Sequence, residues 1–87
     1  MVIRLLPNDS DGSRHQRFIL DLRNGATLLV VHNIDISTVV PVGLGDRVKF
    51  RGVYEWNHLG GLVHWTHRDP HGIEPGGCLE LGSKTYN

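Results

Sequence analysis

Histidine is the residue whose chemistry is most prominent in this chain of 87 residues, which contains six. Five of them lie at or just beyond the ends of expected strands, where small β proteins display functional groups. Imidazole binds metals, exchanges protons near neutral pH and forms hydrogen bonds. Polar, charged and indole side chains accompany these histidines. The sequence predicts that a small anionic or polar ligand binds to a site made of Arg14, His15, Gln16, His32, Asn33, Asp35, Glu55, Trp56, Asn57 and His64.

A divalent metal such as zinc is one ligand that such a group would suit, because imidazole and carboxylate bind first-row divalent ions. The candidate metal ligands are His32, His67 and Asp69. His67 and Asp69 are two residues apart, so they share one face of an extended chain. No spacing matches a known zinc motif. The alternative is that the histidines hold loops in place through hydrogen bonds to carbonyls and carboxylates, with no cofactor.

A metal-assisted hydrolase acting on a phosphodiester is the alternative function for the same residues. A histidine paired with Glu55 or Asp69 would act as general base, and Arg14 would steady the anion. No serine lies in a nucleophile-elbow sequence, and Cys78 has no evident base beside it. The sequence therefore favours a binding protein over an enzyme.

Binding of single-stranded nucleic acid is a further alternative. Arg47, Lys49 and Arg51 alternate along one expected strand, and Trp56 and Trp65 could stack on bases. However, nine Lys and Arg residues balance nine Asp and Glu residues, so the formal net charge is zero. A neutral chain has no general attraction to nucleic acid, and this alternative is not favoured.

The composition predicts an all-β protein, because β-branched residues are abundant while eleven glycines and four prolines interrupt the chain at short intervals. The expected strands cover residues 2–6, 15–23, 27–32, 47–56 and 62–67, with an irregular crossover at 33–42 and a hairpin at 79–86. Asn24-Gly25 is a strong hairpin signal. In the fourth strand Val48, Phe50 and Tyr54 are expected to face the core, and Gly52 to mark a bulge or a sharp bend.

This order of elements predicts a small five-stranded antiparallel barrel of the oligonucleotide/oligosaccharide-binding type. One domain is expected over residues 1–87, with a core at 1–69 and an irregular tail or hairpin at 70–87. The longest apolar run, at 28–31, is too short for a membrane span, and a single cysteine excludes an internal disulfide. A chain without a signal peptide is expected in the cytoplasm. The short first strand leaves a sheet edge partly open, which predicts a homodimer through that edge or through residues 79–86.

Four strings in order, GSRHQRF at 12–18, HNID at 32–35, YEWN at 54–57 and HWTHRDP at 64–70, resemble a family of small bacterial proteins classed as domain of unknown function 3465. The resemblance covers nearly the whole chain. It implies a small β-barrel and no established activity, and relatives often carry an exported leader that is not seen before Met1. Where those relatives have a histidine and then a tryptophan in the tail, this chain has Glu74 and Cys78.

Overall fold

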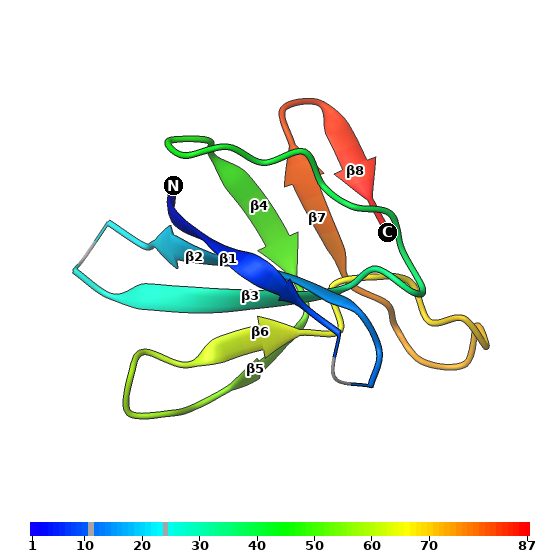
Figure 1. Cartoon of the computed structure of the whole chain (residues 1–87). Helices are drawn as coiled ribbons and strands as arrows, with labels where there is room; N and C mark the ends of the chain where they lie inside the picture. Colours follow the sequence, from blue (N-terminus) through cyan, green and yellow to red (C-terminus); the bar gives the residue numbers. More distant parts are fainter. Residues whose placement is uncertain (11, 24) are drawn as a thin grey trace.

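The computed structural model describes residues 1–10, 12–23 and 25–87, and all regular secondary structure in them is β (Figure 1). This confirms the predicted all-β class. The strands are β1 (Val2–Asp9), β2 (His15–Asp21), β3 (Thr27–Asn33), β4 (Val48–Arg51), β5 (Val53–Glu55), β6 (Leu62–His64), β7 (Cys78–Leu81) and β8 (Lys84–Tyr86). Among the described residues no helix is long and apolar enough to cross a membrane.

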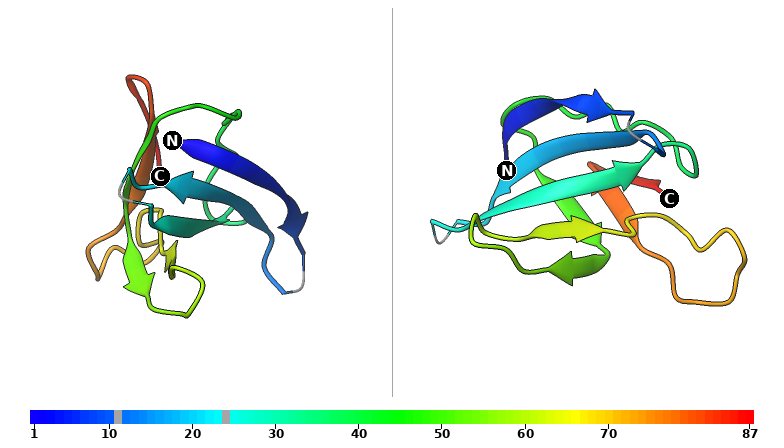
Figure 2. Two further views of the ribbon diagram at one scale, coloured as in Figure 1. Left: turned by 90° about the vertical axis from the view of Figure 1, so that its left-hand side faces the viewer. Right: turned by 60° about the horizontal axis from the view of Figure 1, so that its bottom comes forward.

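The strands form two sheets, one of five strands in the order β1-β2-β3-β6-β5 and one of three in the order β4-β7-β8. In the right-hand view of Figure 2 the five strands lie side by side and the smaller sheet crosses behind them. Neighbouring strands are antiparallel except β3 and β6, which are parallel. The sheets do not close into a barrel, and β3 pairs in parallel with β6, so the expected five-stranded antiparallel barrel is corrected. Among residues 1–10, 12–23 and 25–87, the backbone bonds that join β1 to the segment before β4 involve only Val2, Gly45 and Asp46.

The first strand is longer than expected, since β1 continues through Pro7 to Asp9. Proline is tolerated there because β1 is an edge strand of its sheet and needs no amide donor on its free side. The pairing with β2 shifts register between Leu6 and Asp9. The Pro7 carbonyl accepts bonds from the Arg17 guanidinium, at 3.2 Å from Nε and 3.0 Å from Nη2.

Residues 15–23 alternate between apolar and polar, which predicts that Gln16, Phe18, Leu20 and Leu22 face the core. In the structure every second side chain of β2 is buried, and the same holds for β3, although its residues 28–31 are apolar on both faces. The expected core face of β2 is buried at Gln16, Phe18 and Leu20, whereas Leu22 lies beyond the strand end and is exposed. The apolar core consists of Val2, Phe18, Leu20, Leu28, Val30, Val40, Val63 and Leu79. The apolar run at residues 28–31 predicts that the third strand is central, and this is confirmed, because β3 pairs with β2 on one side and β6 on the other. The predicted Asn24-Gly25 turn includes Asn24, which lies outside the described residues.

Gly52 separates β4 from β5 and lets the chain pass from one sheet to the other, which confirms the expected sharp bend. A Cβ at this position would collide with the His64 carbonyl oxygen and come within 2.9 Å of Val63 Cγ2. Only glycine therefore allows β4 and β5 to cross β6 this closely.

The inner face of β4 is incompletely covered. By register, Val48 lies opposite Leu81, and Phe50 lies opposite the fully buried Leu79, so both face inward as expected. Phe50 is nevertheless 39% exposed, and Tyr54, opposite buried Val63 at the sheet edge, is 56% exposed. The expectation that both rings are core residues is therefore wrong, because the unclosed sheets leave these positions uncovered.

The chain ends in the expected hairpin, formed by β7 and β8. Strand β7 pairs with β4 along its whole length, and Leu79 of β7 belongs to the core. Cys78, also on β7, carries a free, half-buried thiol.

Replacing Gly52 by alanine is expected to lower the free energy of unfolding by about 1–3 kcal/mol, because the added methyl group must displace backbone in a packed region. Chemical denaturation measures this. Gly43→Ala is the matched control, since its Cβ would meet only Asp46 Oδ2 at an ordinary 3.7 Å. Equal stability of the two variants would contradict the close crossing at Gly52.

Candidate functional site

Two of the predicted ligand-binding residues, Gln16 and His32, lie opposite each other on β2 and β3 with buried side chains. The Gln16 amide binds the backbone of Val40 in both directions. Its Nε2 donates to the Val40 carbonyl at 2.7 Å, and its Oε1 accepts from the Val40 amide at 2.8 Å. The side chain thus replaces a strand partner for the crossover, residues 34–47, and both of its polar atoms are engaged with the backbone.

His32 is fully buried and uses both ring nitrogens inside the protein. Its Nε2 lies 3.1 Å from the Thr38 carbonyl oxygen, which can only accept, so Nε2 carries the hydrogen. Its Nδ1 therefore accepts the hydroxyl hydrogen of Thr66, at 2.8 Å. Burial lowers the pKa of His32 and keeps the ring neutral, and the charge of nearby His67 acts in the same direction. A metal or ligand could bind here only by breaking one of these bonds.

The other candidate metal ligands, His67 and Asp69, follow the end of β6. Trp65 has a φ of 59°, which ends the strand two residues before His67. His67 is buried, donates from Nδ1 to the Arg68 carbonyl at 2.8 Å, and packs against the Trp65 ring at 4.9 Å between centroids.

The Asp69 carboxylate is engaged with the backbone of its own loop. It accepts the amides of Glu74 at 2.7 Å, Ile73 at 2.9 Å and His71 at 3.0 Å. These bonds, that of Glu74 first, lower the pKa of Asp69. Within the part of the chain that the structure describes, no three His, Cys, Asp or Glu side chains are placed to hold a metal ion. The predicted set of His32, His67 and Asp69 is therefore not assembled.

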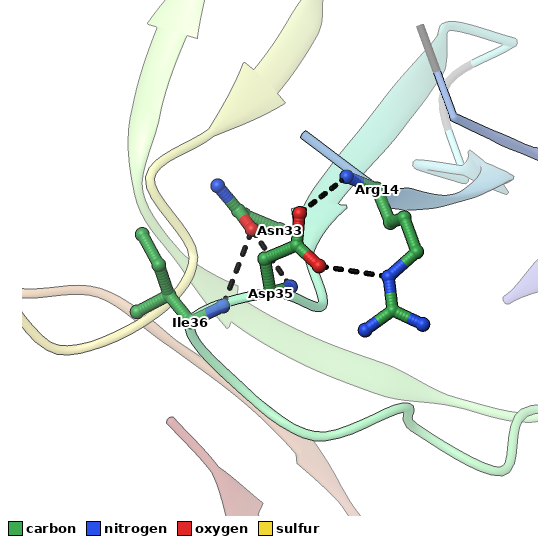
Figure 3. A network of polar contacts seen from close by, with 4 residues as sticks. All are labelled: Arg14, Asn33, Asp35 and Ile36. Carbon is green, nitrogen blue, oxygen red and sulfur yellow. Dashed lines mark hydrogen bonds and ion pairs between the residues drawn. The ribbon is translucent and has the colours of Figure 1, made fainter. Parts of the chain in front are cut away.

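A second group of predicted residues fixes the point where the chain leaves β3 (Figure 3). Asp35 accepts the Arg14 backbone amide at 2.8 Å and the Arg14 Nε at 2.7 Å. The bond from the Arg14 side chain is the main cause of the lowered pKa of Asp35. Asn33 Oδ1 accepts the amides of Asp35 at 2.9 Å and Ile36 at 3.3 Å. His15 begins β2 opposite Asn33. These hydrogen bonds stabilise the turn after β3, and the opposite charges of Arg14 and Asp35 neutralise each other.

A third group lies on β5, β6 and their connection. Glu55 Oε1 and His64 Nε2 are 3.0 Å apart and partly exposed, and Trp56 is 79% exposed. Asn57 Oδ1 accepts the amides of Leu59 and Gly61, both at 2.9 Å, and so shapes the turn. The ten predicted site residues therefore occur in three groups with separate partners.

The groove that sequence reasoning missed runs between the end of β2 and the free edge of β4 and has a volume of about 350 Å³. Because β4 is an edge strand, side chains from both of its faces border the groove. Its lining residues are Met1, Leu20, Asp21, Leu22, Arg23, Arg47, Val48, Lys49 and Phe50. The sequence shows the alternating cations Arg47 and Lys49. It does not show that they line a groove with Leu22 and Arg23, because that depends on the two sheets not closing.

The groove combines an apolar floor with unpaired positive charge. Among the described residues, Arg23, Arg47 and Lys49 form no ion pair, although Glu80 lies opposite Lys49 in the register of β7. Asp21 is the one carboxylate in the lining, and its Oδ1 accepts the Arg23 amide at 2.9 Å. Three cations and one carboxylate leave an excess of positive charge, which attracts anions.

One family model matches the chain, over residues 1–87, and it is described as "Protein of unknown function (DUF3465)". No curated protein and no solved structure matches the chain.

Stability is expected to fall as the pH drops below 6.5, the ordinary pKa of histidine, because the unfolded chain then protonates His32 while the folded protein keeps it neutral. Thermal melts from pH 7.5 to pH 5 measure this slope. His32→Gln should flatten it, whereas His71→Gln, at an exposed position, should leave it unchanged. If His32→Gln does not fold, ring NMR signals of the wild type serve instead, and a His32 ring that titrates at 6.5 contradicts the assignment.

Proposed function

The chain belongs to the DUF3465 family, and we propose that it is a binding module whose ligand is a small anion with an aromatic or apolar part. The observation that carries this proposal is the groove beside β4, where unpaired cations surround an inward-facing aromatic ring that the protein does not cover. A binding protein is also the class of function that the sequence favours. The proposed site, however, is the groove between β2 and β4 and not the group of histidines.

The incomplete burial of Phe50 supports an apolar part in the ligand. Its neighbour in register, Leu79, is fully buried, whereas Phe50 is open to the groove together with Leu22. Exposed apolar surface costs about 25 cal/mol per Å² relative to burial. A ligand that covers this ring would recover that free energy, and an aromatic group would add a favourable ring contact.

The cations support an anionic group in the ligand. The guanidinium groups of Arg23 and Arg47 suit the planar, two-point binding of carboxylate or phosphate, and Lys49 adds a point charge. A hydrogen bond to a charged group contributes about 1.5–3 kcal/mol, more than a neutral one. The groove volume falls within the range of about 300–1,000 Å³ that small-molecule sites occupy.

We further propose that the fold is an open relative of the oligonucleotide/oligosaccharide-binding barrel. Strands β1, β2 and β3 form an antiparallel meander, and the chain returns through the crossover and through β4 and β5 to place β6 beside β3. Gly52 joins β4 and β5 into what would be one bent strand of such a partly open barrel. Barrels of this type bind ligands without a fixed chemistry, which fits a binding module.

Single-stranded nucleic acid is the second candidate ligand, favoured by the exposed surface that continues beyond the groove. Arg51 extends the cations of β4, and the exposed rings of Tyr54 and Trp56 follow on β5 and its connection. Stacking on such rings tolerates any base. A nucleic acid would have to contact residues outside the groove. Arg51 does not line the groove, so a substitution there should affect binding of a nucleic acid and not binding of a small ligand.

Titration of the labelled protein with 1-naphthyl phosphate, an aromatic anion, is expected to shift the amide NMR signals of Leu22, Arg23 and residues 47–50. Inorganic phosphate carries only the anionic group and neutral 1-naphthol carries only the aromatic group, so each should bind more weakly than 1-naphthyl phosphate. Arg47→Gln should weaken 1-naphthyl phosphate about tenfold or more, in line with the loss of a charged hydrogen bond. Arg51→Gln is the matched control, since Arg51 lies at the end of β4 and does not line the groove. Shifts that are absent from the groove, or equal effects of both substitutions, would contradict the small-ligand proposal.

A short single-stranded oligonucleotide tests the second candidate. Its binding should weaken steeply as salt rises, because phosphate neutralisation releases counterions. Both Arg51→Gln and Trp56→Ala should then reduce affinity. If neither substitution alters the affinity, the oligonucleotide does not bind to the surface of β4 and β5.

A further inference from the structure

The outer face of the five-stranded sheet carries one row of side chains that crosses all five strands. Strand pairing aligns Arg4 of β1 with Ile19 of β2, Ile19 with Leu29 of β3, Leu29 with Leu62 of β6, and Leu62 with Glu55 of β5. Directly opposed residues lie on the same side of a sheet. The row therefore runs from a cation through three apolar residues to a carboxylate.

The two neighbouring rows of this face mix apolar and polar residues. One contains Leu6, Arg17 and Val31, and the Arg17 guanidinium is held by the Pro7 carbonyl at the β1 edge. The other contains Asp21 and Thr27. A hollow of about 320 Å³ lies over Ile19 and Leu29, between Arg4 and the β5–β6 connection. In the part of the chain that the structure describes, no strand covers this face, and the smaller sheet packs on the opposite side (Figure 2).

We propose that a second copy of this chain packs face to face on the row, about a two-fold axis parallel to the strands. Such a rotation exchanges the two edges of the sheet, so the β1 edge of one copy lies over the β5 edge of its partner. Arg4 then meets the partner's Glu55 at both ends of the interface. Ile19 meets the partner's Leu62, and Leu29 meets the partner's Leu29 on the axis. Sheets that pack in this way keep their strands aligned to within about 30°.

The charges of the row favour a second copy over a partner of another kind. The row has one cation and one carboxylate at opposite ends and so has no net charge to attract a strongly charged polymer. The same arrangement is self-complementary under the two-fold rotation. Among the described residues Arg4 has no ion-pair partner, and a second copy supplies one. The dimer expected from the sequence is thus placed on the sheet face instead of the β1 edge or the β7–β8 hairpin.

The size of the face sets the strength of the association. Five strands spaced by about 4.8 Å span about 19 Å, so the contact belongs to the small end of specific interfaces. The dimer is therefore weak and reversible, and its population depends on concentration. Formation of this dimer does not use the groove residues and is independent of the proposed ligand.

Sedimentation velocity between about 10 and 500 μM is the test. The wild type should shift from monomer to dimer in this range. Arg4→Glu and Glu55→Arg, both at exposed positions, should each weaken dimerisation at least tenfold, because each places like charges against each other at both ends. An equimolar mixture of the two variants should dimerise like the wild type, since every end contact is again between opposite charges.

Two controls separate this interface from general charge effects. Arg51→Glu makes the same charge change on the other sheet and should leave dimerisation unchanged. His64→Gln removes the Glu55–His64 bond without reversing the charge at the β5 edge, and it too should have no effect. A wild type that stays monomeric at 500 μM, or a mixture that does not restore dimerisation, would overturn the proposal.

Discussion

The buried pair of Gln16 and His32 is the interaction on which the arrangement of the two sheets depends. Both side chains project from the centre of the five-stranded sheet, and both bind the backbone of the crossover, at Val40 and at Thr38. The crossover then pairs at Gly45 and Asp46 with Val2 before it enters β4. The start of β4, and with it the groove along its free edge, is placed by these few polar contacts, and the ladder with β7 fixes the rest of the strand.

A buried polar group in a small core is destabilising unless it is hydrogen-bonded, because an unsatisfied donor or acceptor costs about 1–3 kcal/mol. Gln16 meets this condition with one donor and one acceptor on the same residue, and His32 meets it with Thr38 and Thr66. An apolar residue in place of Gln16 would leave the Val40 amide without its partner, and the Val40 carbonyl would keep only the bond from the Val42 amide, at 2.8 Å. These two polar residues are thus structural requirements of the fold.

Local patterns in the sequence are sufficient to predict some elements and insufficient for others. The alternation of β2, the bend at Gly52 and the final hairpin follow from side-chain period and turn residues, and each is confirmed. The parallel pairing of β6 with β3 depends on contacts between distant segments, which alternation within one strand does not contain. The role of His32 likewise depends on its hydrogen bond to the crossover, at Thr38. The sequence does not show that bond, so a buried structural histidine can be mistaken for a ligand-binding one.

The zero net charge of the chain conceals an uneven use of its charges. Arg14 is neutralised by Asp35 and Arg17 is bound to a carbonyl, so these cations stabilise turns and edges. The cations of β4 and Arg23 have no ion-pair partner among the described residues and border apolar surface. The histidines do not add equally to the charge in acid either, because burial keeps His32 neutral. Electrostatic attraction in this protein is therefore decided by which charges the fold leaves unpaired, and three of these, Arg23, Arg47 and Lys49, border the groove beside β4.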